Sequence, residues 1–510
     1  MAATMVLVNG RIHTMNPQQP TATAVAVQGG RILAVGADEA MRALLGAGGA
    51  LVDLQGRGVT PGLMDAHVHF QWYSLNLQHI DLFEVPSLAE AQQRVRAYLA
   101  QRAGGAAGWL QGRGWSQDLW PDRRFPTAAD LDAVAPDVPL FLRHKSGHAA
   151  WVNGRALALA GITRHTPDPP GGQIQRDAAG APTGILFEDA MSLVRVHIPE
   201  PTAAEVVAAM RAAQARCWQA GLTGLHDFDG RASFQALQTL RQTGELGLRV
   251  VKNIPVYRLE HAVGVGLRTG FGDEWLRIGG VKLFADGALG PRTAAMLAPY
   301  EGEPDNTGIV VTDKEEMMEK VSLASTHGLS ATIHAIGDRA NHDVLDVYAA
   351  VRQEEAARGA AGPRLRHRIE HVQILHPADV PRLAQLGVIA SMQPTHCVAD
   401  MEMADRYWGA RTRTSYAWRQ LQETGAGLAF GPDPPIEDIA PLPGLIAAVT
   451  RRRADGYSGA AGWHPAQKLT MAEAVRAFTM GTAVAGTQES VLGSITPGKL
   501  ADLTIFDGDI

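Results

Sequence analysis

Two histidines, His67 and His69, stand two residues apart at the end of a short apolar segment, residues 61–69. In a β-strand, side chains two residues apart point to the same face, so both imidazole rings could bind one metal ion. A His-x-His pair is weak evidence when it stands alone, and its position at the end of a strand strengthens it. The pair therefore predicts a metal site if further ligands meet it.

Four further candidate ligands lie near the ends of later apolar segments: Lys282, His334, His371 and Asp433. Each has another interpretation by itself. The lysine could be a surface residue or half of a buried ion pair, the histidines could bond to backbone, and the aspartate could cap a helix. If none of these residues bound a metal, a separate explanation would have to hold for each of them, and all would lie at equivalent positions of one fold by coincidence. The six residues together therefore favour a metal centre.

Lys282 is the one charged residue of an otherwise apolar segment, residues 279–285. A buried ammonium group is costly without a partner, and a dication beside it would repel it. Reaction with carbon dioxide would turn the amine into an anionic carbamate with two oxygens. Because paired metals in hydrolases lie about 3.5–4 Å apart, such a group could bridge them. We therefore expect two divalent ions, zinc or alternatively manganese, and a carbamate on Lys282.

The candidate ligands require a fold that brings distant strand ends together. Eight short apolar segments alternate with helical patterns, which predicts parallel βα units. Eight such strands close a (β/α)8 TIM barrel, whose active site lies at the carboxyl ends of the strands. The predicted strands are residues 63–69, 222–227, 248–254, 278–285, 329–335, 367–373, 388–393 and 428–431.

Helix starts are indicated by four capping boxes, in which Ser or Thr is followed three residues later by Glu. They are Ser87/Glu90, Thr202/Glu205, Thr312/Glu315 and Thr470/Glu473.

The two ends of the chain differ from the barrel, because they consist of short strand-like segments separated by turns. We expect residues 1–60 and 486–510 to form one small β-sandwich and residues 61–485 the barrel, which gives an α/β protein. About 150 residues separate the first two barrel strands, so the barrel carries a large insertion at about 70–201. This segment, rich in Trp, Arg and Gly, is predicted to be a lid over the substrate, with a subdomain that makes no pocket contacts as the alternative.

Composition narrows the possible partners. The 510 residues are 46% hydrophobic and 19% charged, with a net charge of −6, so a basic surface for nucleic acid is not expected. The N-terminal segment does not resemble a signal peptide, long apolar runs are lacking, and the two cysteines lie far apart, which predicts a cytoplasmic protein without membrane contact. A small amide-type molecule is the expected partner, and a homodimer is possible.

Several motifs resemble those of the amidohydrolase superfamily, in particular its YtcJ-like branch, which includes N-substituted formamide deformylase. They are residues 147–153 (GHAAWVN), 281–290 (VKLFADGALG), 334–340 (HAIGDRA) and 368–371 (RIEH). The similarity extends over nearly the whole chain. It implies a buried metal ion held by His67, His69 and Asp433, a more exposed one held by His334 and His371, and Lys282 as the bridge.

These observations predict a metal-dependent hydrolase of a carbon–nitrogen bond, such as an N-substituted formamide or N-acyl compound. A metal ion can bind water and lower its pKa, and Asp433 is the expected general base. Candidate substrate contacts are His148, Arg292, Gln393 and Trp115, although Arg292 could instead pair with Asp286. A deaminase or a lactone or ester hydrolase on the same scaffold is the alternative, followed by a non-catalytic binding protein.

Overall fold

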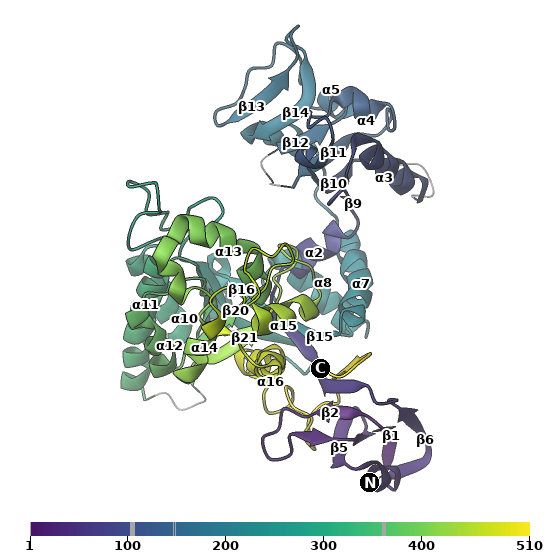
Figure 1. Ribbon diagram of the computed structural model, residues 1–510, viewed down its shortest axis with the longest axis vertical. Helices are drawn as coiled ribbons and strands as arrows, with labels where there is room; N and C mark the ends of the chain where they lie inside the picture. Colours follow the sequence, from purple (N-terminus) through teal and green to yellow (C-terminus); the bar gives the residue numbers. More distant parts are fainter. Residues whose placement is uncertain (1, 102–107, 146, 148, 360–363) are drawn as a thin grey trace. The chain divides into compact units, whose positions relative to one another are not determined.

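The computed structural model describes residues 2–101, 108–145, 147, 149–359 and 364–510. The chain divides into two compact units, one formed by Met1–Tyr73 with Met210–Ile510 and the other by Ser74–Ala209. Within the described residues, the larger unit contains a parallel sheet of eight strands and two sheets of four strands, and the smaller unit a sheet of six strands (Figure 1).

The eight-stranded sheet is the predicted barrel, and each of its strands lies within a few residues of its predicted position. Neighbouring strands are parallel throughout. Gly431, directly after the last strand, lies so close to Asp65 of the first that a Cβ on it would come within 1.9 Å of Asp65 Oδ1, so the sheet nearly closes. In order around the sheet the strands are β8 (Leu63–Val68), β15 (Leu222–Asp227), β16 (Arg249–Pro255), β17 (Leu276–Phe284), β18 (Ala331–Ala335), β19 (Arg368–His371), β20 (Ile389–Met392) and β21 (Gly427–Phe430).

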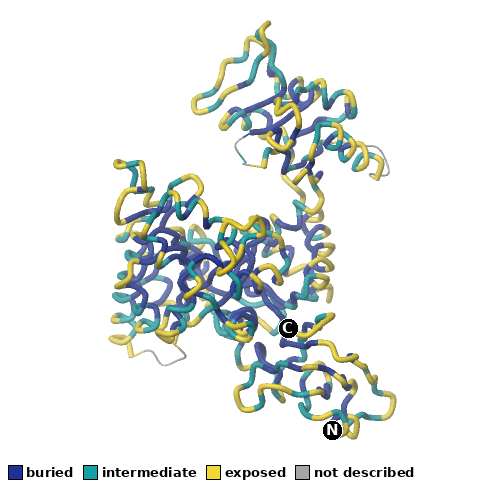
Figure 2. The backbone as a smooth tube through the Cα atoms, in the orientation of Figure 1, coloured by how far each residue is buried: buried dark blue, intermediate teal, exposed yellow. Residues whose placement is uncertain are grey.

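The barrel strands are buried along most of their length, as the dark segments in Figure 2 indicate. Parallel strands covered on both faces are expected to be apolar almost continuously, which explains why short apolar runs identified them. The division between the two units falls inside α2 (Phe70–Asn76) and α7 (Ala203–Gln219). The helices that lie wholly in the larger unit are α1 (Asp38–Arg42), α8 (Arg231–Gln242), α9 (Leu259–Gly264), α10 (Lys314–Thr326), α11 (Asp338–Ala357), α12 (Val380–Leu386), α13 (Pro394–Trp408), α14 (Trp418–Glu423), α15 (Pro441–Thr450), α16 (Met471–Arg476) and α17 (Thr482–Ala485).

Three of the four predicted helix starts carry the expected bonds. Thr470 and Glu473 form a complete capping box before α16, Thr202 and Glu205 bond reciprocally before α7, and Ser87 accepts the Glu90 N–H. The box predicted at Thr312/Glu315 is wrong, because Asp313 caps α10 and accepts the Glu316 N–H at 2.8 Å. A carboxylate at the next position is an equally good cap.

Both ends of the chain contribute to the two small sheets of the larger unit. The C-terminal strand β22 (Leu503–Phe506) pairs with β7 (Gly58–Pro61), beside β2 (Arg11–His13) and β3 (Thr21–Ala22). The other sheet holds β1 (Ala3–Val8), β4 (Ala24–Gln28), β5 (Arg31–Gly36) and β6 (Leu45–Asp53). Buried residues of both sheets, among them Leu7, Val25 and Val59, form one hydrophobic cluster. A separate β-sandwich domain stays a prediction, because these sheets belong to the same compact unit as the barrel.

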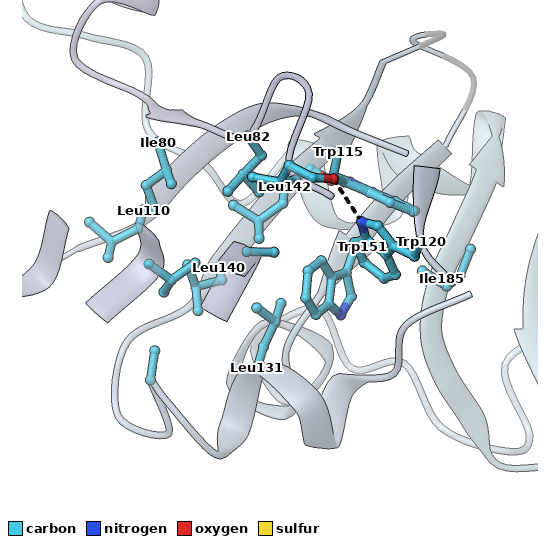
Figure 3. Packing of buried hydrophobic residues seen from close by; sticks show 14 residues of the cluster. Ile80, Leu82, Leu110, Trp115, Trp120, Leu131, Leu140, Leu142, Trp151 and Ile185 are labelled. Atoms are coloured by element: carbon cyan, nitrogen blue, oxygen red, sulfur yellow. Dashed lines mark hydrogen bonds between the residues drawn. The ribbon is translucent and has the colours of Figure 1, made fainter. Parts of the chain in front are cut away.

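The smaller unit has its own sheet and core. Its strands are β9 (Ile80–Asp81), β10 (Leu110–Trp115), β11 (Leu140–His144), β12 (Ala149–Val152), β13 (Gly172–Arg176) and β14 (Pro182–Glu188), and its helices are α3 (Leu88–Gln101), α4 (Ala128–Asp132), α5 (Gly154–Leu159) and α6 (Ser192–Arg195). Trp115, Trp120 and Trp151 lie together in one buried cluster (Figure 3). Among the described residues, no helix combines the length and apolar character needed to cross a bilayer.

Candidate metal centre

The two histidines of the His-x-His pair lie where β8 ends, and a carboxylate holds each ring. His67 Nδ1 lies 2.6 Å from Glu370 Oε2, and His69 Nδ1 lies 3.0 Å from Asp229 Oδ1. A carboxylate can only accept, so each Nδ1 carries a proton, and Nε2 is the nitrogen of each ring that could bind a metal. Carboxylates that bond to the far nitrogen of a metal-binding histidine commonly orient its ring in this way.

Asp433 belongs to two groups of possible metal ligands. One group is His67, His69 and Asp433, and the other is His371, His396 and Asp433; within each group the ligand atoms lie within 4.8 Å of one another. The Asp433 carboxylate lies 4.0 Å from His67 Nε2 through Oδ1 and 3.9 Å from His396 Nε2 through Oδ2. Among the described residues, Asp433 Oδ1 is buried without a hydrogen-bond partner. A buried acceptor facing imidazole lone pairs fits a divalent cation.

Lys282 and His334 lie at the same end of the barrel but outside these two groups. The Lys282 ammonium is buried, with Nζ 4.7 Å from the ring centres of Phe228 and Phe284. The His334 ring lies 4.5 Å from that of His371, and its Nε2 is 2.9 Å from the Gly287 carbonyl oxygen. The barrel thus brings all six predicted ligands to one end, with His334 bonded to backbone.

Burial would lower the pKa of His69, but the hydrogen bond and the charge of Asp229 outweigh it and raise that pKa. At the other imidazoles described here burial prevails. It lowers the pKa of His67 and His371 well below the usual value, and that of His396 to about 4. These imidazoles are therefore neutral at pH 7, the form that binds metals. Burial also lowers the pKa of Lys282 to about 8, although the nearby Glu370 and Asp433 oppose the shift.

The backbone turns sharply at His371, the last residue of β19, and at Asp433, which follows β21. His371 has a φ of 77° and Asp433 a φ of 65°, in the left-handed region that non-glycine residues rarely adopt. Before Asp433 the chain must pass Asp65, which leaves no room for a side chain at Gly431. Such conformations occur most often at functional sites, where they direct a side chain towards a shared centre.

Three residues of the centre were not among the predicted site residues: His396, Asp229 and Glu370. His396 lies in α13, four residues after strand β20 ends at Met392, so the rule that barrel sites follow strand ends could have identified it. Glu370 belongs to the RIEH motif but was not assigned a role. Asp229 follows β15 by two residues and carries no motif of its own.

The predicted substrate contacts have different surroundings. Gln393 is buried and its Oε1 accepts the His371 Nδ1–H at 2.8 Å, which makes it a partner of a candidate ligand. Arg292 does not pair with Asp286; its Nε lies 2.6 Å from Glu303 Oε1. The Trp115 indole is fully buried in the smaller unit and donates to the Leu142 carbonyl, so it packs rather than faces a ligand (Figure 3). His148 lies outside the described residues.

Comparison with known proteins agrees with this geometry. A model of the amidohydrolase family matches residues 50–510. This chain belongs to the amidohydrolase family. Three relatives of this amidohydrolase align along nearly its whole length. Protein LONG AFTER FAR-RED 3 of Arabidopsis thaliana is 33% identical and the match covers 99% of this chain and 87% of the relative. YtcJ of Bacillus subtilis (strain 168) is 32% identical, with 98% and 93% covered.

N-substituted formamide deformylase of Arthrobacter pascens is 28% identical, and the match covers 99% of this amidohydrolase and 93% of the relative. The predicted family and branch are thereby confirmed. A metal-dependent hydrolase from Pyrococcus furiosus has a crystal structure that superposes with a TM-score of 0.80 at 29% identity, covering 99% of both chains. Family and neighbour together support a hydrolase that depends on a divalent metal.

Proposed function

We propose that this amidohydrolase hydrolyses an amide-type carbon–nitrogen bond at a centre of two divalent metal ions, with zinc as the metal and manganese as the alternative. The observation that carries the proposal is the position of Asp433, which belongs to both ligand groups and has a buried oxygen without a hydrogen-bond partner in the described part of the chain. The similarity to N-substituted formamide deformylase supports the type of bond.

The site residues are proposed to have two roles, as metal ligands and as a general acid–base. His67, His69 and Asp433 would hold one ion, and His371 with His334 the other; His396 beside His371 is an alternative ligand. When bound, the metals polarise a carbonyl and lower the pKa of water. Asp433 accepts a proton from the water that attacks the amide carbon. It then donates this proton to the nitrogen as the carbon–nitrogen bond breaks, which restores the carboxylate.

We also propose that Lys282 is carboxylated, and that the carbamate would supply anionic oxygen ligands to the metal centre as its bridging group. Its support is the burial of an amine among candidate ligands, with Nζ 4.7 Å from the ring centres of both Phe228 and Phe284. Lys282→Ala should lower the metal content of the protein, and a short carboxylate such as propionate should partly restore it. Full metal content in Lys282→Ala without added carboxylate would contradict the bridging role.

The substrate is proposed to carry an apolar substituent next to the amide. Two aromatic side chains beside the candidate ligands are partly exposed: Trp72, whose ring lies 5.8 Å from that of His69, and Phe284, whose ring lies 5.3 Å from that of His334. Exposed apolar surface next to a polar site is typical of ligand pockets. The smaller unit, in the first βα connection, is proposed to act as a lid.

The test combines metal analysis with a substrate panel. Zinc- and manganese-loaded protein is assayed on N-substituted formamides, N-acyl amino acids and hydantoin-like rings, with lactones and aminopurines as representatives of the alternative activities. Asp433→Asn should lower turnover by about 10²–10⁴-fold, the range for loss of general acid–base catalysis. Asp379→Asn, which alters a buried carboxylate on the outer helices, is the control. Unchanged turnover in Asp433→Asn, or activity confined to lactones or aminopurines, would overturn the proposal.

A further inference from the structure

Two buried, positively charged side chains contact the segments next to the His-x-His pair, and the proposed mechanism gives them no role. They are Arg368 at the start of β19 and Lys252 in the middle of β16, each with only 2% of its surface exposed. Buried charges are costly unless they are paired, so each must be held by specific contacts. Both cations contact the segments whose carboxylates bond to His67 and His69.

Arg368 holds the carboxylate of Glu370. Its Nε lies 2.6 Å from Glu370 Oε1, while the other carboxylate oxygen, Oε2, lies 2.6 Å from His67 Nδ1. The guanidinium is fixed by two more contacts: Nη2 donates to the Ala66 carbonyl at 2.9 Å, and Nη1 donates to His226 Nδ1 at 2.7 Å. One planar group thus holds the carboxylate and also the backbone immediately before His67.

Lys252 holds the segment that follows β15. Its Nζ lies 2.7 Å from Asp227 Oδ2 and also donates to the Asp229 carbonyl. The carboxylate of Asp229 bonds to His69 Nδ1, and Asp227 Oδ1 accepts the N–H of Phe70, the residue after His69. Lys252 therefore fixes both the partner of the His69 ring and the backbone beside it.

We propose that Arg368 and Lys252 are positioning residues that set the metal affinity of the centre, one through Glu370 and His67, the other through Asp229 and His69. The inference rests on the metal-dependent function proposed above. Without Arg368, the Glu370 carboxylate loses a contact that fixes its direction. Without Lys252, the backbone that carries Asp229 and the Asp227 carboxylate each lose a contact. In both cases the histidine loses support for its orientation. Loss of such outer partners typically weakens metal binding about 10–100-fold.

The test measures the zinc dissociation constant by competition with a chromophoric chelator, using the full-length protein stripped of metal and reloaded. Arg368→Met and Lys252→Met each remove a charge and keep an unbranched apolar chain; we expect the dissociation constant to rise about 10–100-fold. Arg249→Met is the matched control. Arg249 is also a buried arginine of a barrel strand, but its carboxylate partner, Asp502, lies in the C-terminal segment away from the metal centre. It should destabilise the protein without changing zinc affinity.

A double replacement separates positioning from damage to the fold. Arg368→Met combined with Glu370→Gln leaves no carboxylate at position 370 without its cation, so it is the variant to use if Arg368→Met does not fold. If the arginine acts through Glu370, the double variant should bind zinc as weakly as Glu370→Gln alone. Zinc affinities of Arg368→Met and Lys252→Met equal to that of the wild type would refute this inference while leaving the metal centre intact. A wild-type protein that binds no zinc would instead refute the proposed function and this inference with it.

Discussion

The Gln393 amide could contact the substrate or orient the candidate ligand His371, and an experiment can distinguish these two roles. Its Oε1 accepts the His371 Nδ1–H at 2.8 Å, and both side chains are buried. Gln393→Met keeps the length of the side chain and removes the acceptor. Leaving a buried donor without a partner costs about 1–3 kcal/mol. If this destabilisation affects the zinc-bound protein, in which His371 is held in one orientation, and not the zinc-free protein, zinc affinity should fall about 10–100-fold. A difference of 1.4 kcal/mol corresponds to a tenfold change in affinity.

The assay measures the zinc dissociation constant together with kcat and KM at saturating zinc. Weaker zinc binding with a nearly unchanged KM at saturation indicates that Gln393 orients His371. Gln214→Met is the matched control, because Gln214 is equally buried but accepts the Gly247 N–H on the outer surface of the barrel. Unchanged zinc affinity combined with a raised KM would refute the orienting role and return Gln393 to the substrate contacts predicted from the sequence.

Three further predictions concern pH, substrate and metal. Burial would raise the pKa of Glu355, but hydrogen bonds from His367 and Arg352 outweigh it and lower the pKa to about 2. The ionised carboxylate therefore adds about 2 kcal/mol to the free energy of unfolding. This contribution is present above the ordinary pKa of a glutamate and is lost as the pH falls towards 2. Urea unfolding should therefore find Glu355→Gln less stable than the wild type at pH 7, with the difference shrinking below about pH 4.5. Phe284→Ala should raise KM more for amides with bulky apolar substituents than for small ones, whereas Trp218→Ala, an exposed tryptophan elsewhere, should not. Removing zinc with EDTA should lower Tm, since a ligand at about 100 times its Kd contributes about 2.7 kcal/mol.

The barrel could be predicted because its strands differ from their surroundings in composition. A strand such as Ile389–Met392 is buried at every residue, so it is apolar along its whole length, and its position between helices fixes its direction. The candidate ligands could be located because each of these polar residues interrupts or ends such a run. His67 and Asp433 are examples, since the strand ends of a barrel meet at one place.

The partners of the ligands could not be predicted in this way. Glu370 contacts His67 across 303 residues of chain, and His69 contacts Asp229 across 160, so neither contact leaves a local pattern. His396 follows its strand inside a helix, where a histidine has no distinctive spacing. Trp115 was misassigned for a related reason: a tryptophan beside arginines looks the same in sequence whether it lines a pocket or fills the core of the smaller unit.

Backbone conformation at the strand ends explains why these particular residues converge. His371, Val372 and Asp433 all have positive φ, at 77°, 46° and 65°, and for the β-branched Val372 this conformation is rare. Each such residue costs about 1–2 kcal/mol, which the surroundings must offset. Backbone hydrogen bonds contribute to this, such as the one from Val372 N–H to the Ala335 carbonyl at 3.1 Å. Successive side chains of a strand point to alternate faces, and at the end of β19, where the chain turns at His371, Glu370 is directed at His67 and His371 at Gln393.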